Sequence, residues 1–362
     1  MPDSLEREIK MKSVLVLEDG TYFAGEAFGK KGEMVGEVVF NTCMTGYQEI
    51  STDPSYNGQI VTMTYPLIGN YGFNNEDTES YKSHAQGFIV KELCDYPSNW
   101  RSSSLPDEYF TKNNIVGIKG IDTRALTQHI RKFGSMFGII SSECGNLDIL
   151  GERLQQKKEE KRNLVMEVTT KIPIHKPGSG KKVVVLDFGV KYNIIRSLEK
   201  RNCDIHILPA FSSVEEVLDL NPDGILLSNG PGDPKDLPSV KANIQKLLGK
   251  KPILGICLGH QLLGLSLGGN TYKLKFGHHG GNHPVKDYIT GRCYITSQNH
   301  NYALEKDFSR DVNITHLNVN DGTVEGFRHK TMPVISVQYH PEAAPGPQDS
   351  AYIFDDFIAM MK

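Results

Sequence analysis

The second half of the chain alternates short, largely apolar runs with segments of helical periodicity. The apolar runs are short enough to be strands and lie at Val183–Leu186, Ile205–Leu208, Gly224–Leu227 and Ile253–Ile256. The spacing between them predicts helices at Tyr192–Lys200, Val214–Leu220 and Val240–Leu248, with a last helix near Ser350–Met361. Apolar strands that alternate with helices indicate a mostly parallel sheet covered by helices on both faces. After Gly269 the pattern returns to strands.

The first half, from residue 12 to about 140, is richer in strand signals. The apolar stretches Val14–Leu17 and Thr21–Ala24 flank Glu18-Asp19-Gly20, in which Asp-Gly is a hairpin signal. Further strands are predicted at Val35–Phe40, Ile60–Thr64 and Gly87–Val90. A helix capped by Asp122 or Thr123 is expected to end at Lys132, before Gly134, and a charged helix is expected at Leu147–Arg162.

A stretch rich in proline, glycine and lysine, Lys171–Lys182, separates the two halves and has the composition of a linker. A chain of 362 residues is also long for a single core. We therefore predict an N-terminal domain at 1–168, a linker at 169–181 and a C-terminal domain at 182–362. The predicted fold class is α/β, with a parallel sheet in the C-terminal domain and a β-rich α+β N-terminal domain.

Composition narrows the classes of partner. The formal net charge of −3, with 23% charged residues, gives no sign of nucleic acid, and no stretch is apolar enough for a membrane helix. The first eleven residues lack the apolar core of a secretory signal, so a cytoplasmic location is expected. The six cysteines are unclustered, which favours reduced thiols over disulfides.

Cys257 is the candidate nucleophile. It follows the strand predicted at Ile253–Ile256 and precedes a helical pattern that begins at Leu258. Gly255 and Gly259 flank it, and a tight strand-to-helix turn requires such small neighbours. The sulfur then lies at the first turn of a helix, where free backbone N–H groups favour the thiolate over the thiol.

A second motif, His340-Pro341-Glu342, follows the apolar run Pro333–Val337. Pro341 favours an extended backbone at His340, and side chains two apart on an extended segment point the same way. Glu342 can therefore orient the imidazole of His340. Together with Cys257 these residues supply a nucleophile, a base and an orienting carboxylate, which indicates acyl transfer.

The tetrahedral oxyanion of such a reaction needs backbone donors. The N–H of Leu258 is placed for this role by the turn after the nucleophile. The loop Ser228–Pro234 contains Gly230 and Gly232 and can offer a second N–H. Taken alone, that loop is equally well read as a turn between strand and helix.

Cofactor motifs are absent from the sequence. It contains no G-x-x-x-x-G-K-[ST] and no dinucleotide fingerprint, so we expect no cofactor in this chain. The segment Phe276–His283 contains three histidines, which we interpret as a polar turn near the site, so no metal is predicted.

The motifs alone leave alternatives open. A single cysteine is commonly a small buried hydrophobic residue, and a thiol peptidase or hydrolase would use the same three groups. A non-catalytic scaffold that stabilises a partner is a third possibility, although retention of the nucleophile, base and carboxylate argues against it.

The second half resembles the class I, or triad, glutamine amidotransferases. The resemblance lies in Gly255–Gln261, in Ser228–Pro234 and in His340-Pro341-Glu342. It implies that Cys257 attacks the side-chain amide of L-glutamine, that His340 transfers protons and that Glu342 orients His340. It also implies a set of glutamine contacts at Ser55, Gly230, Gly232, Leu258, Gln261, Asn299, Asn301 and Tyr302. The family usually has glycine at the position of Asn301, and asparagine is expected to keep a left-handed turn there.

The first half is similar to one family within this class, the small, glutamine-hydrolysing subunits of carbamoyl-phosphate synthetases. The similarity lies in Glu37–Thr42, Met44–Ile50, Thr52–Tyr56 and Ile121–Arg124, together with Phe276–His283. It implies a large partner subunit that binds ATP, Mg²⁺ and bicarbonate and receives ammonia through a tunnel. It also implies further assembly of the heterodimers and a product used in arginine and pyrimidine synthesis. The alternative is a glutaminase subunit of a different synthetase.

Overall fold

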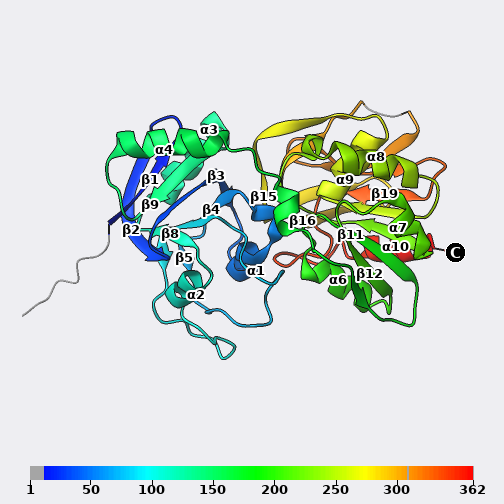
Figure 1. Cartoon of the computed structure of the whole chain (residues 1–362), viewed down its shortest axis with the longest axis horizontal. Coiled ribbons are helices and arrows are strands. Elements are labelled where there is room, and N and C mark those ends of the chain that lie inside the picture. The colour runs from blue at the N-terminus through cyan, green and yellow to red at the C-terminus, as the bar shows by residue number, and fades with distance from the viewer. Residues whose placement is uncertain (1–11, 308–309, 362) are drawn as a thin grey trace, which may run out of the picture.

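The structure is a computed structural model that describes residues 12–307 and 310–361. The expectations about the first eleven residues lie outside that part. Two domains lie side by side, with the N-terminal domain on the left and the C-terminal domain on the right of Figure 1. Two long strands of the second domain, β15 (Thr271–Asp287) and β16 (Cys293–Leu304), reach the boundary, where β15 contacts β3 (Glu33–Asn41).

The N-terminal domain is a closed barrel in the order β1-β2-β8-β6-β4-β3-β9. Its other strands are β1 (Lys12–Leu17), β2 (Tyr22–Gly29), β4 (Gln59–Met63), β6 (Gly87–Val90), β8 (Val116–Lys119) and β9 (Met136–Ser141). The predicted Asp-Gly hairpin joins β1 to β2, and β9 closes the barrel by pairing with both β1 and β3. A small separate pair is formed by β5 (Leu67–Ile68) and β7 (Glu92–Leu93).

Helices cover the barrel and extend it toward the second domain. They are α1 (Tyr47–Thr52), the 3₁₀ turn η1 (Pro54–Tyr56), α2 (Pro106–Lys112), α3 (Thr123–Phe133), α4 (Leu147–Glu159) and α5 (Leu164–Val168). The start of α3 lies where the sequence predicts it, because the side chain of Asp122 accepts a hydrogen bond from the N–H of Ala125. The predicted charged helix is α4, which begins at Leu147 as expected and ends at Glu159. The short helices α1, α2 and α5, the turn η1 and the barrel closure were not anticipated from the sequence.

The C-terminal domain contains a ten-stranded sheet in the order β10-β12-β11-β13-β14-β19-β18-β17-β15-β16. The strands not yet given are β10 (Ile174–Lys176), β11 (Lys182–Asp187), β12 (Asp204–Pro209), β13 (Gly224–Leu227), β14 (Ile253–Ile256), β17 (Val312–Asn318), β18 (Val324–His329) and β19 (Val334–Val337). The run from β12 to β19 is parallel, and the pairs beyond it are antiparallel. The predicted fold class is confirmed.

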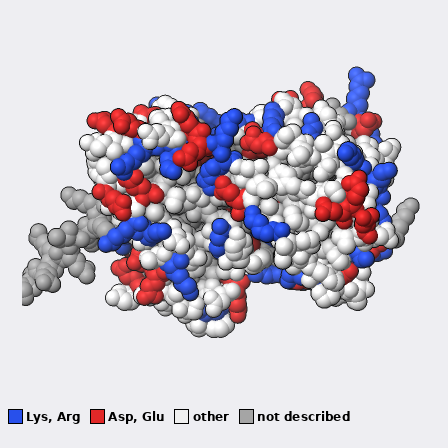
Figure 2. All heavy atoms as spheres, in the orientation of Figure 1, with Lys and Arg blue, Asp and Glu red and all other residues white. Residues whose placement is uncertain are grey.

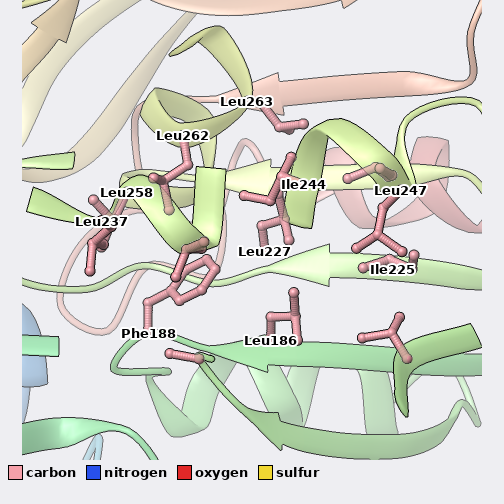
Figure 3. Packing of buried hydrophobic residues seen from close by; sticks show 14 of the residues in the cluster. Leu186, Phe188, Ile225, Leu227, Leu237, Ile244, Leu247, Leu258, Leu262 and Leu263 are labelled. Atoms are coloured by element: carbon pink, nitrogen blue, oxygen red, sulfur yellow. The ribbon is translucent and has the colours of Figure 1, made fainter. Parts of the chain in front are cut away.

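Both faces of the parallel part are buried, as the apolar strands predict. Val184 and Leu186 of β11 pack in one cluster with α7 (Val214–Asp219), α8 (Pro238–Leu247) and α9 (Leu258–Ser266), part of which Figure 3 shows. Val183 and Val185 face the opposite cluster with α6 (Tyr192–Glu199) and α10 (Tyr352–Ala359). Each buried aliphatic side chain contributes roughly 1.5–3 kcal/mol. This packing holds the carboxyl ends of β13 and β14 in place.

The segment predicted as a linker contains a strand. β10 pairs antiparallel with β12 and forms one edge of the ten-stranded sheet, with Ile174 opposite Ile207. Proline and glycine flank the strand and do not interrupt it, since an edge strand tolerates nearby proline. The boundary segment is therefore attached to the second domain.

Charged side chains of both signs are interspersed over the face shown in Figure 2. Among the described helices, none combines the length and the apolar content that crossing a bilayer requires.

Candidate active site

Cys257 lies at a strained turn between β14 and α9. Its backbone has φ 52° and ψ −104°, a conformation that a non-glycine residue adopts rarely and at a cost of about 1–3 kcal/mol. The two flanking residues must be glycines, because there is no room for a side chain at either position. A side chain at Gly255 would meet the backbone of Gly259 at 2.7 Å, and one at Gly259 would collide with the carbonyl oxygen of Leu227. The thiol is 2% exposed, and its sulfur lies 3.6 Å from the carbonyl oxygen of Asn299.

His340 and Glu342 form a buried pair. Nδ1 of His340 lies 2.6 Å from Oε1 of Glu342, and both residues are at most 2% exposed. Nε2 of His340 has no hydrogen-bond partner within the described part of the chain. Burial lowers the pKa of His340, but the carboxylate of Glu342 and the nearby Cys257 outweigh burial and raise it. The sulfur is thus within electrostatic reach of the imidazole.

The pair is brought together differently from the extended geometry predicted. β19 ends at Val337, and Glu342 lies in a turn in which the N–H of Ala343 donates to the carbonyl oxygen of His340 at 3.1 Å. Asn193 of α6 donates to the carbonyl oxygen of Glu342. The turn, and not a common strand face, therefore places the carboxylate beside the ring.

Lys191 completes this cluster, and the sequence did not single it out. Its Nζ lies 3.0 Å from Oε1 of Glu342 and donates to the carbonyl oxygen of Ala343 at 2.5 Å. Burial lowers the pKa of Lys191, but Glu342, Asp53 and Glu79 raise it to about 12. Burial raises the pKa of Glu342, while Lys191 and His340 bring it well below its usual range. The carboxylate is therefore held ionised beside His340.

A cavity of about 220 Å³ opens beside Cys257. The structure brings to its wall all of the predicted glutamine contacts except Leu258, together with Cys257. These are Ser55, Gly230, Gly232, Gln261, Asn299, Asn301 and Tyr302. Leu258 is buried directly after the nucleophile, where its N–H opens α9. Gly230 must be glycine, because a side chain there would collide with the carbonyl oxygen of Phe188.

The N-terminal domain supplies part of this wall. The side chain of Asn229 donates to Oγ of Ser55 at 2.8 Å, and Nδ2 of Asn299 donates to Oδ2 of Asp53 at 3.0 Å. These contacts are buried and join η1 to the second domain. The cavity also involves residues that the sequence analysis missed, namely Glu37, Asn57, Arg162, Leu164, Lys273 and His300. Glu37 begins a stretch that carries the family similarity, but no local pattern assigned any of these residues to the cavity, whose wall both domains form.

The backbone conformation of Asn301 differs from the one expected from the sequence. It lies within β16, outside the described residues with positive φ, so the left-handed turn expected there is absent. The strand is extended because its neighbours pair with β15, as in the match of His300 with His278. The asparagine side chain links the domains. Nδ2 donates to Oε2 of Glu37 at 2.7 Å, and Oδ1 lies 2.8 Å from Nε2 of His279.

Replacing Asn301 by glycine is expected to raise the KM for glutamine about 5–30-fold with a smaller change in kcat, since two hydrogen bonds worth about 1–2 kcal/mol in total are lost. Steady-state glutaminase kinetics measure this. Asn282→Gly is the matched control. It removes an exposed interdomain hydrogen bond, between Oγ1 of Thr42 and Oδ1 of Asn282 at 2.8 Å, away from the cavity. An unchanged KM in Asn301→Gly would show that this link does not hold the cavity wall.

The fold and the site have the features of one enzyme class. Residues 184–360 match the family model described as glutamine amidotransferase class-I, so the second domain is a class I glutamine amidotransferase domain. A solved structure of a glutamine amidotransferase from Thermotoga maritima is 21% identical, with a TM-score of 0.38, and the match covers 45% of this chain and 77% of that one.

Residues 15–140 match the CPSase domain of the carbamoyl-phosphate synthase small chain. The carbamoyl phosphate synthase small chain of Syntrophotalea carbinolica is 54% identical, over 97% of this chain and 98% of that protein. The pyrimidine-specific small chain of Bacillus subtilis is 53% identical, over 97% and 96%. The carbamoyl phosphate synthase small chain of Clostridium perfringens is 55% identical, over 96% of this chain and 99% of that protein.

The chain belongs to the carbamoyl phosphate synthase small-chain family. The predicted class, family and enzymatic activity are thereby confirmed, and the family name implies a large partner subunit and the use of glutamine.

Proposed function

We propose that Cys257, His340 and Glu342 are the catalytic residues by which this small chain releases ammonia from L-glutamine. The observation that carries the proposal is the position of the strained Cys257 at the cavity wall, within electrostatic reach of an imidazole paired with a buried carboxylate. The other residues at the cavity wall then bind glutamine or stabilise the charge that develops during the reaction.

In the first half-reaction the thiolate of Cys257 attacks the side-chain carbonyl carbon of glutamine. A C–S bond forms, and the oxygen takes up negative charge opposite the N–H groups of Leu258 and the Gly230 loop. The C–N bond then breaks, and His340 gives the departing nitrogen the proton it took from the thiol. Ammonia leaves, and a glutamyl thioester remains.

In the second half-reaction His340 removes a proton from water, which attacks the thioester carbonyl. The C–S bond breaks, glutamate is released and Cys257 is restored. Glu342 keeps the imidazole oriented in both halves, and Lys191 keeps that carboxylate ionised. Gln261 already uses its Nε2, which donates to the carbonyl oxygen of Tyr302 at 2.7 Å and to Oε1 of Gln338 at 3.1 Å. Its side-chain oxygen remains for the substrate.

The ammonia is passed to the large partner subunit, which uses ATP, Mg²⁺ and bicarbonate to form carbamoyl phosphate. The complex of the small and large subunits acts in the cytoplasm and supplies carbamoyl phosphate for arginine and pyrimidine synthesis. These heterodimers assemble further. Support comes from the match of the whole chain to small chains, including a pyrimidine-specific one.

The test is ATP-dependent carbamoyl phosphate formation from glutamine, measured with and without a candidate large chain. Formation should require both chains, while the large chain alone should use only added ammonia. If the pair hydrolyses glutamine but forms no carbamoyl phosphate, the chain serves a different synthetase. If the pair forms carbamoyl phosphate from ammonia yet never releases glutamate, the chain acts as a scaffold.

A further inference from the structure

His279 lies buried behind the glutamine cavity, and the proposed reaction gives it no role. The segment Phe276–His283, which the sequence predicts to be a polar turn, lies within strand β15, because it pairs with β16. In that antiparallel pair His279 is directly opposite Asn299. Asn301 is two residues further along β16, so its side chain points to the same face as that of Asn299. The ring of His279 therefore lies beside two residues of the cavity wall.

Each nitrogen of this ring faces one side-chain oxygen of the wall. Nδ1 of His279 lies 2.9 Å from Oδ1 of Asn299, and Nε2 lies 2.8 Å from Oδ1 of Asn301. Burial lowers the pKa of His279, so at pH 7 the ring is neutral and carries a single proton. The ring therefore donates to one amide oxygen and lies in contact with the other. A single imidazole thus bridges two of the residues predicted to contact glutamine.

The other ends of both asparagine side chains are held by carboxylates of the N-terminal domain. Nδ2 of Asn299 donates to Oδ2 of Asp53 at 3.0 Å, and Nδ2 of Asn301 donates to Oε2 of Glu37 at 2.7 Å. An ionised carboxylate only accepts hydrogen bonds, so these contacts turn both amide oxygens toward His279. The direction of each asparagine side chain is therefore set from two sides, by a carboxylate and by the ring.

The backbone around His279 keeps the ring in this place. The N–H of Thr42 donates to the carbonyl oxygen of His279 at 3.2 Å, which ties β15 to the N-terminal domain. Gly277 has φ 71°, and a side chain there would come within 2.2 Å of Oδ1 of Asn301 and 2.4 Å of Nε2 of His279. Glycine is therefore needed at this position both for the backbone conformation and for the contact between ring and amide.

We propose that His279 is a positioning residue that aligns Asn299 and Asn301 for the binding of glutamine, an inference that rests on the proposed glutaminase function. The ring does not line the cavity, so it acts through the two asparagines. The pairing of β15 with β16 holds the backbone, so the ring sets the direction of these side chains and not the path of the strand. Substrate binding should therefore depend on His279 more than the chemical step does.

The experiment measures KM and kcat for glutamine hydrolysis by the complex with the large chain. His279→Leu keeps a side chain of similar size at the buried position and removes the donor. It is expected to raise KM about 5–30-fold and to change kcat less than about threefold, because the ground state and the transition state lose the same contact. Carbamoyl phosphate formation from added ammonia should stay within about twofold, since it does not use the glutamine cavity.

Two conservative variants separate positioning from a packing defect. An asparagine at position 279 can place an N–H donor near the position of Nδ1, and a glutamine can place one near that of Nε2. Because the neutral ring carries a single proton, one of His279→Asn and His279→Gln should keep KM within about threefold of the unsubstituted chain. The other should resemble His279→Leu. The variant that restores binding identifies the ring nitrogen that donates.

His84→Leu is the matched control. His84 is a buried histidine of the N-terminal domain, 4% exposed, and its ring packs on Tyr81 with the ring centroids 5.7 Å apart. It does not line the glutamine cavity. The same substitution at this position should therefore leave KM and kcat unchanged.

The inference is overturned if His279→Leu has the same KM as His84→Leu, or if it lowers kcat and leaves KM unchanged. If His279→Leu does not fold, the two conservative variants decide, and the inference fails when both have the same KM. A complex of the unsubstituted chain that releases no glutamate from glutamine would overturn the proposed function and this inference with it. Normal glutamate release, with no effect of His279→Leu, would overturn this inference alone.

Discussion

Replacing Cys257 by serine is expected to lower glutamine-dependent carbamoyl phosphate formation at least about 10³-fold while ammonia-dependent formation stays within about twofold. Serine fits the same turn, but its hydroxyl is far less acidic than a thiol, so the imidazole of His340 cannot hold the nucleophile ionised. Ammonia added to the solution bypasses the thioester. Both rates are measured on the complex with the large chain, and the thioester is sought by mass spectrometry of the unsubstituted protein.

Cys293→Ser is the matched control, since Cys293 is an exposed free thiol outside the cavity. It should leave both activities unchanged. Normal glutamine turnover by the Cys257→Ser variant would show that another residue is the nucleophile. A parallel loss of both activities would mean that the substitution disturbs assembly instead of chemistry.

Local patterns predicted the elements that hold this cysteine. The strands at Gly224–Leu227 and Ile253–Ile256 occur at the predicted positions, because a short run buried on both faces leaves little freedom in its ends. Gly255 and Gly259 were interpretable from the sequence because the elbow requires small residues at fixed offsets. The structure around motifs that are contiguous in the sequence could therefore be predicted from the sequence alone.

Contacts between residues that are far apart in the sequence could not be predicted from it. Lys191 directly precedes α6, and its position marked only the start of a helix. Its contact with Glu342 spans the domain and depends on the turn after β19. The interdomain contacts of Asp53 and Glu37 likewise depend on how the barrel docks. The buried cluster of His278, His300 and Glu325 likewise draws on three strands, whose pairing no local pattern specifies.

Replacing Lys191 by methionine is expected to lower the free energy of unfolding by about 3–5 kcal/mol at pH 7, because it leaves buried carboxylates without their cation. Glutamine hydrolysis should fall about 10²-fold or more, since Glu342 would no longer be held ionised beside His340. Methionine keeps the length of the side chain, so the loss reports on charge. Urea unfolding and steady-state glutaminase assays provide the two measurements.

The pH dependence separates this charge effect from a packing defect. The pKa of Lys191 is raised from 10.5 to about 12, so its contribution is complete below pH 10.5 and is lost as the pH rises through about 12. The pKa of Glu342 is lowered from 4.5, so its contribution is complete above pH 4.5 and is lost as the pH falls through the lower, folded-state value. The difference between Lys191→Met and the unsubstituted chain should therefore be largest between those limits and shrink on either side.

A packing defect would give a difference that does not vary with pH. Lys176→Met is the matched control, because Lys176 pairs with Glu199 at 2.9 Å on the surface, with both side chains nearly half exposed. That pair is worth less than about 1 kcal/mol, so the control should be close to neutral. If Lys191→Met were as stable and active as Lys176→Met, the buried cation would have no part in keeping the carboxylate of Glu342 ionised.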